Sequence, residues 1–510
     1  MRQDLSFSRD ENVVPSTILI PFTNQAPQEW LTNSASAWAA AGVRQVIVTG
    51  PGADKLQPAS AKLDWKLQPA DRPFQGQIWN QLLEGVSTPV LLLVNGDANA
   101  DLSAEGIARL TSQVVETGAS ILYSNYAEET PTGTADHPTI PYQLGSIRDG
   151  FDFGPVVAIN VDAIRQARAR FGPLMDTQWA GWYDLRLRLS VLSLPVHIPE
   201  TLYRCRKLDN RPTGQQIFDY QDPRHRAAQE EMEKVATEHL KRIDAYLAPS
   251  FARPPVGESR FPVEASVVIP VRNRAKTIAD AVRSALAQEA PFKFNVIVVD
   301  NHSTDGTTDI LRDLAAKNDR LVHLVPERTD LGIGGCWNHA VQSPHCGRVA
   351  VQLDSDDLYS GPDTIRQIVA KMDEGPYAMV VGSYQMVNFE LKEIPPGLID
   401  HREWTRDNGR NNLLRVNGLG APRAFLTELF RRHPLPNVSY GEDYWIGMRL
   451  SREYEIGRIF EPVYLCRRWD GNTDANLPLP AKNAHDTYKD RLRTLEILAR
   501  QQMNRKGGSA

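Results

Sequence analysis

Short apolar runs alternate with segments of helical periodicity along the second half of the chain. The apolar runs have the length of β-strands and lie at 266–270 (SVVIP), 295–299 (NVIVV), 321–325 and 348–353. The segments between them space apolar residues three and four apart, as a helix covered on one face does, at 275–288, at 307–317 and around Asn338. This alternation predicts an α/β fold: a mainly parallel sheet with helices on both faces.

The same order of segments occurs in the first half, about 250 residues earlier. TILIPFTN (17–24) matches SVVIPVRN (266–273), and QVIVTG (45–50) matches NVIVVD (295–300). Further pairs join GQIWN (76–80) to GGCWN (334–338) and ETLYRCRK (200–207) to EPVYLCRR (461–468). An internal duplication therefore predicts two related, Rossmann-like α/β domains.

The chain divides into four expected parts. Residues 1–222 and 263–480 are the two domains. Residues 223–262 hold a polar helix, about 223–248, followed by a linker rich in Pro and Gly (SFARPPVGESRFP). Residues 481–510 supply a C-terminal helix, about 481–501, and a tail.

Acidic residues at strand ends distinguish the two copies. In the second copy Asp300 ends a strand, the stretch VQLDSDDLY (351–359) holds three acids, and Gly441 precedes an acidic pair. The first copy has Gly50 for Asp300, NGDA at 95–98 for DSDD, and no acidic pair near 180–182. The apolar framework persists while the charges are lost, which indicates that the first copy is non-catalytic.

Taken alone, the acids of 354–357 fit two readings. Asp and Ser favour turns, so an acidic turn is the simpler one. The other is a site for Mg²⁺ or Mn²⁺, which take carboxylate oxygens and water. Ligands in parallel α/β sheets bind beyond the carboxyl ends of the strands, where these acids fall.

Composition narrows the class of protein. The net charge of −5 gives no sign of a nucleic-acid partner. The four cysteines are too dispersed for a disulfide framework, which favours a reducing compartment. No apolar run is long enough to span a bilayer. We expect a cytoplasmic protein and leave open peripheral attachment to the inner face of the membrane.

Five segments of the second half, in this order, resemble the family 2 glycosyltransferases, which use a GT-A fold and nucleotide-sugar donors. They are SVVIPVRNRAKTIADAVRSALAQ, NVIVVDNHSTDGTTDIL, LGIGGCWNHAV, VQLDSDDLY and YGEDYWIGMRLS. The resemblance covers residues 264–475, and the first copy keeps only the framework of it over 16–206.

The resemblance implies a site for Mn²⁺ or Mg²⁺ at the D-x-D motif. Asp356 would be a direct ligand, and Asp354 would contact the ribose or a metal-bound water. Relatives often supply a late His as a further ligand, where this chain has Trp469. Asp470 and His485 are the substitutes, although His485 also matches His225 of the first copy, which favours a structural role equally.

The resemblance also implies a donor pocket and a base. Asp300 would contact the uracil edge of the nucleotide. Asp443 would take the proton of the acceptor hydroxyl, with Glu442 binding the acceptor or supporting the base; decoration of a helix N-terminus is the alternative for this pair. The remaining donor-site residues would be Pro270, Arg272, Asn273, Gly334 and Asn338.

The expected activity is therefore metal-dependent, inverting transfer of a hexosyl or N-acetylhexosaminyl group. The donor would be a nucleotide sugar, in the first place a UDP-sugar, and the acceptor a hydroxyl of a carbohydrate, a lipid-linked glycan or a protein. The first domain would serve as an acceptor platform, a scaffold or a contact within a homo-oligomer. Alternatives are a tandem bifunctional polysaccharide polymerase, a nucleotidyltransferase or retaining GT-A enzyme, and a nucleotide-sugar- or glycan-binding protein without turnover.

Overall fold

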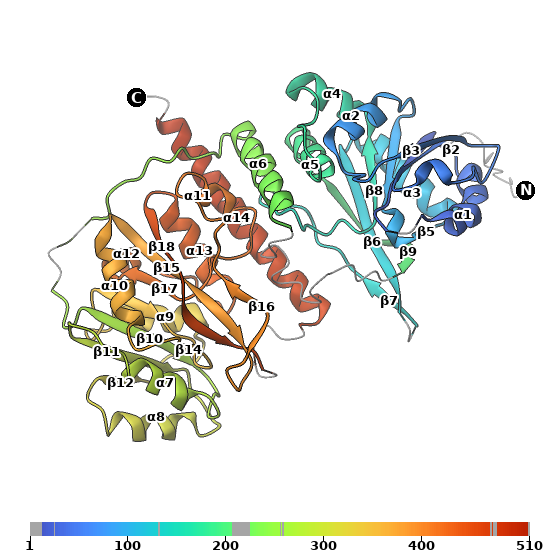
Figure 1. Cartoon of the computed structure of the whole chain (residues 1–510). Coiled ribbons are helices and arrows are strands. Elements are labelled where there is room, and N and C mark those ends of the chain that lie inside the picture. Colours follow the sequence, from blue (N-terminus) through green and yellow to red (C-terminus); the bar gives the residue numbers. More distant parts are fainter. Residues whose placement is uncertain are drawn as a thin grey trace, which may run out of the picture.

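The computed structural model describes residues 13–24, 26–130, 133–206, 225–255, 257, 260–469, 472 and 477–507. Two nine-stranded sheets, each flanked by helices, account for most of them (Figure 1). Residues 223–224 of the expected linking segment, Asp470 and the last three residues lie outside the described part of the chain.

The first sheet has the strand order β3-β2-β1-β4-β8-β6-β9-β5, with β7 paired to β6. Its strands are β1 (Ser16–Pro21), β2 (Val43–Gly50), β3 (Asp64–Pro69), β4 (Val90–Val94), β5 (Asp101–Leu102), β6 (Ile121–Thr130), β7 (Gly133–His137), β8 (Val156–Asn160) and β9 (Val196–Arg206). Its helices are α1 (Gln28–Ala40), α2 (Gly76–Glu84), α3 (Ala104–Thr117), α4 (Val161–Phe171) and α5 (Gly181–Leu192), with short 3₁₀ turns η1 (Ala53–Lys55) and η2 (Gly96–Ala98).

The second sheet has the order β12-β11-β10-β13-β17-β15-β18-β14, with β16 paired to β15. Its strands are β10 (Ala265–Val271), β11 (Phe294–Asp300), β12 (Leu321–Leu324), β13 (Val349–Gln352), β14 (Leu358–Tyr359), β15 (Tyr377–Val387), β16 (Glu393–Ile399), β17 (Arg423–Leu426) and β18 (Glu455–Arg467). Its helices are α7 (Ile278–Leu286), α8 (Thr307–Ala315), α9 (Ile333–Gln342), α10 (Thr364–Glu374), α11 (Gly409–Asn412), α12 (Thr427–Arg432) and α13 (Glu442–Ser451).

Strand for strand, the two orders are the same, which agrees with the duplication read from the sequence. Both sheets are mixed rather than mainly parallel. β12, β11, β10 and β13 run parallel, and the next strand, β17, is antiparallel to β13 and to β15. The first half of each domain therefore follows the expected βαβ pattern, and the second half adds antiparallel strands to the same sheet.

Strand β10 shows why these runs are apolar throughout. All of its residues except Pro270 are buried, because helices cover both faces of the sheet. Val267 and Ile269 belong to the core on one face and Val268 to the core on the other.

Two further helices join the domains. Helix α6 (Arg226–Arg242) lies within the expected 223–248, and α14 (Leu479–Gly507) extends past the expected 501. In Figure 1 α14 (red) runs along the junction of the two halves with α6 (green) beside it. One apolar cluster continues through Ile147 and Leu187 of the first domain, Val235 of α6 and Ile497 of α14, so the halves share a core.

Candidate active site

The D-x-D segment begins where β13 ends, and its first acid, Asp354, is partly buried. The Asp354 amide donates to the Tyr464 hydroxyl at 3.0 Å, and Gln352 donates its side-chain amide to Asp354 Oδ1 at 2.9 Å. Burial raises the pKa of Asp354, the charges of Asp356 and Asp443 add to that rise, and Arg423 opposes it.

Asp356 is half-buried and faces several N–H donors. Its Oδ2 accepts from Trp469 Nε1 at 3.2 Å and from Asn472 Nδ2 at 3.3 Å, and it lies 4.0 Å from Arg274 Nε. The Arg467 side chain donates to the Asp356 backbone carbonyl. Trp469, which stands where relatives often have a His, therefore contacts the predicted metal ligand through its indole N–H.

Asp357, the third acid, is a structural residue. It is buried, and its Oδ1 accepts from the backbone N–H of Arg467 at 2.8 Å, which ties the segment to the end of β18. Burial, followed by the charges of Asp354 and Asp356, holds the pKa of Asp357 well above its usual value.

Asp300 organises the loop after β11. Its carboxylate accepts from the Ser303 backbone N–H at 3.1 Å and from the Thr308 hydroxyl at 2.5 Å, and it lies 3.5 Å from His323 Nε2. Burial acts to raise the pKa of Asp300, but the bonds from Thr308 and Ser303 outweigh it and the pKa is lowered. Asp300 is fully buried, and its carboxylate is already hydrogen-bonded to Ser303 and Thr308.

The loop after β10 is bound to that loop through Asn273. Asn273 has φ of 54°, its side-chain oxygen accepts from the Thr304 N–H at 2.8 Å, and its own N–H donates to the Ser303 hydroxyl at 2.9 Å. Pro270 is half-buried beside Val299, and Arg272 is exposed. Asn273 thus fixes the rim of the predicted donor pocket, and Arg272 is available at its surface.

Gly334 and Asn338 serve the packing of α9, and the first copy repeats both contacts. A Cβ on Gly334 would lie 2.1 Å from the Pro436 carbonyl, and one on Gly76 would lie 1.9 Å from that of Met175. The Asn338 amide brackets Leu435, accepting from its N–H at 2.9 Å and donating to its carbonyl at 2.8 Å.

Asn80 brackets the backbone of Leu174 in the same way, at 2.9 and 3.1 Å. A contact present in the copy that lacks the acids belongs to the fold. The side-chain amide of Asn338 is thus taken up by backbone groups.

The acidic pair opens α13 and faces two cations. Asp443 Oδ2 accepts from Arg423 at 2.6 Å, and Arg423 also donates to the Gly420 carbonyl at 3.0 Å. Burial acts to raise the pKa of Asp443, but Arg423 and Lys489 outweigh it and hold the pKa below its usual value. Asp443 is therefore ionised at neutral pH.

Glu442 has the opposite character. Its side chain is buried, and its Oε2 has no hydrogen-bond partner among the described residues. Burial and the neighbouring charge of Asp443 raise the pKa of Glu442 to about 8. Two adjacent carboxyl groups are thus held in different protonation states, an arrangement suited to proton transfer.

Sequence reasoning missed the two cations. Arg423 opens the apolar strand β17, and Lys489 lies on α14, outside the segments that carried the resemblance. Lys489 is buried and donates to the Asn417 carbonyl at 2.7 Å. A charged residue at the head of an apolar strand was the one available signal, and it pointed only to Arg423.

His485 is not gathered with the D-x-D acids. His485 lies on α14, and its ring stacks on the Tyr440 ring with 3.7 Å between the centroids. Burial lowers the pKa of His485. Within the described ranges no set of three or more His, Cys, Asp and Glu side chains is arranged to hold a metal ion. The expected set of Asp354, Asp356 and His485 is therefore not assembled, and Asp354 and Asp356 are the acids left for a cation.

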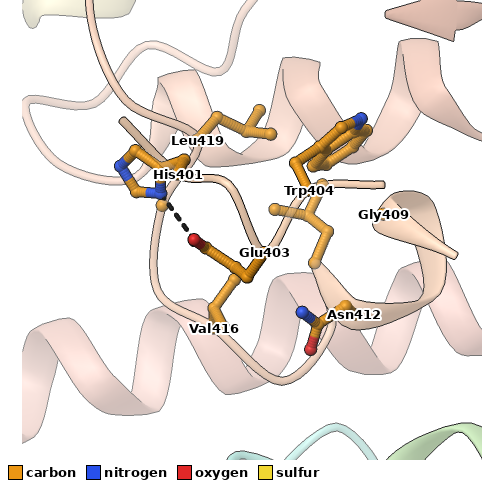
Figure 2. Close-up of a pocket in the computed structure, with 9 residues that line it drawn as sticks. His401, Glu403, Trp404, Gly409, Asn412, Val416 and Leu419 are labelled. Atoms are coloured by element: carbon orange, nitrogen blue, oxygen red, sulfur yellow. Dashed lines mark hydrogen bonds and ion pairs between the residues drawn. The ribbon is translucent and has the colours of Figure 1, made fainter. Parts of the chain in front are cut away.

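A small hollow of about 10 Å³ lies within the segment 401–419. Figure 2 shows His401 and Glu403, joined by a 2.8 Å hydrogen bond, with Trp404 and Leu419 on its wall. Leu419 packs on α13, where a Cβ at Gly447 would lie 1.9 Å from it. None of the predicted site residues lines this hollow.

The matching region of the first domain is filled. Asp97, the one acid it kept, accepts from the N–H groups of Thr23 and Asn24 at 3.0 Å and from the Thr23 hydroxyl at 2.7 Å. A Cβ on Gly50 would lie 2.6 Å from the buried Phe22 ring. Phe22 therefore occupies the space in front of the position that Asp300 holds in the second copy.

No helix among the residues with described structure is both long and apolar enough to cross a membrane.

Two curated relatives illustrate the sequence similarity. Succinoglycan biosynthesis protein ExoU of Rhizobium meliloti is 29% identical over 206 residues, 38% of this chain and 56% of the relative. GalNAc(5)-diNAcBac-PP-undecaprenol beta-1,3-glucosyltransferase of Campylobacter jejuni is 24% identical over 244 residues, 46% of this chain and 73% of the relative. The chain spans about half of ExoU, and 22% and 36% of two further relatives, AglD of Haloferax volcanii and ExoO of Rhizobium meliloti.

Among solved structures, Staphylococcus aureus TarS 1–349 in complex with UDP-GlcNAc is 22% identical, covers 46% of this chain and 72% of its own, and has a TM-score of 0.36. The family model described as glycosyl transferase family 2 matches residues 266–436, which include the strand ends with Asp300 and Asp354. This segment of the chain is therefore similar to glycosyl transferase family 2.

Proposed function

We propose that this protein transfers a glycosyl group from a nucleotide-sugar donor, in the first place a UDP-sugar, to an acceptor hydroxyl with inversion. The second domain, which we place at residues 263–480, performs the chemistry, and the domain of residues 1–222 is non-catalytic. The observation that carries this proposal is a chain of contacts at the end of β13. Gln352 donates to Asp354 and accepts from the Arg423 backbone N–H, and Arg423 forms an ion pair with Asp443 at 2.6 Å.

The donor diphosphate would lie at Asp354 and Asp356. The residues present fit a divalent cation, because Asp356 is partly exposed and its charge helps to raise the pKa of Asp354, an unfavourable arrangement that a cation relieves. Bound there, Mn²⁺ or Mg²⁺ would neutralise charge on the leaving nucleotide. Arg274 and Arg467 are the cations that the chain itself places beside Asp356.

Asp443 would act as the general base. It is ionised at neutral pH, so it can accept the proton of the acceptor hydroxyl as that hydroxyl attacks the anomeric carbon. Glu442, with its raised pKa, carries a proton at neutral pH and can donate a hydrogen bond to the acceptor. The nucleotide base would lie against the joined loops after β10 and β11, with Arg272 at its edge and Asp300 holding the loop in shape.

The test is donor binding and transfer by the purified full chain. UDP- and GDP-sugars are titrated with and without Mn²⁺ and incubated with a panel of glycan acceptors. We expect Asp356→Ala to abolish the metal-dependent part of donor binding, and Asp443→Asn to leave binding intact while transfer falls by about 10³.

The matched control is Asp97→Ala, the equivalent change in the first domain, which should leave both readouts unchanged. Metal-independent binding, or full transfer by Asp443→Asn, would overturn the mechanism. Binding without transfer in the wild type would identify a binding protein instead. A bifunctional polymerase is disfavoured, because Phe22 occupies the space beside Gly50 and Asp97 is hydrogen-bonded to the Thr23 backbone. The Asp97→Ala control tests this alternative.

A further inference from the structure

We propose that Lys489 is a positioning residue for Asp443 and that the first domain holds Lys489 in place through the adjacent Asp490. The inference rests on the proposed function, because it concerns the base of that reaction. It gives the domain without a working site a part in the chemistry of the other.

Lys489 is a buried cation placed against the acidic pair. Its ammonium lies 4.6 Å from the centre of the Tyr440 ring, two residues before the pair, and 5.3 Å from that of Tyr444, the residue after it. The ammonium also donates a hydrogen bond to the Asn417 carbonyl, which holds it between the two rings. Burial lowers the pKa of Lys489 to about 8, while the charges of Asp443 and Glu442 act to keep it protonated.

The next residue, Asp490, is held by the first domain. Its fully buried carboxylate accepts from the Ser146 hydroxyl at 2.8 Å and from Arg148 Nε at 3.3 Å. One turn further on, the Thr494 hydroxyl accepts from the Gly145 N–H at 2.9 Å. Neighbouring positions of one helix thus face the two domains, so a shift of the 145–148 loop would move Lys489.

A second route joins the same contacts to α13. Asp490 Oδ1 accepts from Arg493 at 2.7 Å, and Arg493 Nε donates to the Tyr444 hydroxyl at 2.9 Å. Tyr444 donates in turn to the Leu413 carbonyl. The helix that carries Asp443 is therefore connected to Arg148 through buried groups, whose rearrangement is costly.

The first copy has the framework of this arrangement without its cation. Helix α6 packs across the junction as α14 does: Gln229 of α6 accepts from Arg415 at 2.6 Å, and Glu233 accepts from Asn412 at 3.1 Å. On the alignment that pairs His225 with His485, Lys489 corresponds to Gln229. The lysine thus accompanies the copy that kept the acids.

The ionisable groups around Asp443 come from four elements. They are Glu442 beside it on α13, Tyr440 before the helix, Arg423 on β17, Asp354 after β13, and Lys489 on α14. Of these ionisable groups, only Arg423 and Lys489 favour the ionised carboxylate, which also accepts from the Tyr444 N–H at 2.7 Å. Removing Lys489 should therefore raise the pKa of Asp443 and move the acidic limb of the pH–rate profile to higher pH.

The experiment compares kcat and KM from pH 3 to 9, a range that reaches the low pKa of Asp443, for four full-length proteins: the wild type, Lys489→Met, Lys489→Arg and Arg148→Met. We expect Lys489→Met to move the acidic limb up by roughly one pH unit with little change in KM for the donor. Lys489→Arg should restore the profile. Arg148→Met should move the limb in the same direction by less, because the lysine is displaced rather than removed.

The control is Arg491→Met, which removes an exposed cation from the same helix and should leave the profile unchanged. If the wild type transfers sugar and Lys489→Met has the same pH–rate profile as the wild type, this inference is wrong and the proposed function is unaffected. A profile that moves in Lys489→Met and not in Arg148→Met would overturn the part given to the first domain. A wild type without transfer on any donor would overturn the proposed function as well.

Discussion

At the end of β13 several acidic side chains lie near Arg423. At the matching end of β4 there is one, Asp97, and it accepts hydrogen bonds from backbone N–H groups. Asp97 satisfies Thr23 and Asn24 and makes no ion pair with a side chain in the described part of that domain. The framework beneath is common to both, down to the Asn80 and Asn338 brackets. Fold and chemistry are therefore separable here: packing contacts survive in both copies and the charged set in one.

The largest expected effect tests whether Phe22 closes the first site. Phe22→Ala should lower the free energy of unfolding by about 3–5 kcal/mol, because the fully buried ring fills the space beside Gly50. Chemical denaturation checks this, and calorimetry with UDP should still detect no site in the first domain when the second is silenced by Asp356→Ala. UDP binding by the double variant would mean that the first site was blocked rather than dismantled.

The second prediction concerns the pair that the first copy lacks. Glu442 has a folded pKa of about 8 against a usual 4.5, so the folded state holds its proton more tightly and stability falls as pH rises between those values. Glu442→Gln should remove that fall and gain on the order of a few kcal/mol over the wild type at pH 8. Urea unfolding at pH 5 and pH 8 measures it.

The control for this change is Glu453→Gln on the same domain, whose side chain is 37% exposed. It should keep the pH dependence of the wild type. If Glu442→Gln loses stability equally at both pH values, the carboxyl group is ionised in the folded protein and the reading of the pair is wrong.

The third prediction is that Gly76 and Gly334, which occupy matching positions in the two domains, respond alike to substitution. Gly76→Ala and Gly334→Ala should each destabilise by about 1–3 kcal/mol, because the added Cβ would meet the carbonyl of Met175 or of Pro436. Gly418→Ala is the matched control, since a Cβ there meets nothing within 4 Å. Thermal unfolding compares the three. A large loss of donor affinity in a stable Gly334→Ala protein would return Gly334 to the donor site.

The smallest effect is expected at the asparagine brackets. Asn80→Ala and Asn338→Ala each leave the backbone groups of one leucine without partners, at a cost of about 1–2 kcal/mol. The two losses should be similar, and donor KM should be unaffected in both. Unequal losses would show that Asn338 has a role beyond the framework.

The confirmed expectations rest on the local pattern of apolar and polar residues along the sequence. Apolar runs with helical segments between them predicted the first four strands of the second domain and the helices between them, and the charge differences between the copies pointed to the strand ends where Asp300 and Asp354 lie. The antiparallel strands β15 to β17 were missed, since an apolar run does not state its direction. Arg423 and Lys489 were missed because each reaches Asp443 only through the folded topology.

Gly334 and Asn338 teach a different lesson. Both lie in a segment that resembles the family, and the resemblance predicts that they line the donor site. The first copy, with Gly76 and Asn80 at the matching places, already contained the argument for packing. His485, opposite His225, shows the same ambiguity, and the stacking of its ring on Tyr440 places it away from the D-x-D acids.

The reciprocal packing of α6 and α14 bears on why the first domain persists. Ile147 and Leu187 share a core with Ile497, so deleting the first domain would leave α14 with a bare apolar face. Point substitutions at Gly50 or Asn95 remove no such contact. Acids at these strand ends can therefore be lost at little thermodynamic cost, whereas loss of the whole domain would expose the core that it shares with α14. The first domain therefore acts as a permanently attached packing partner of α14.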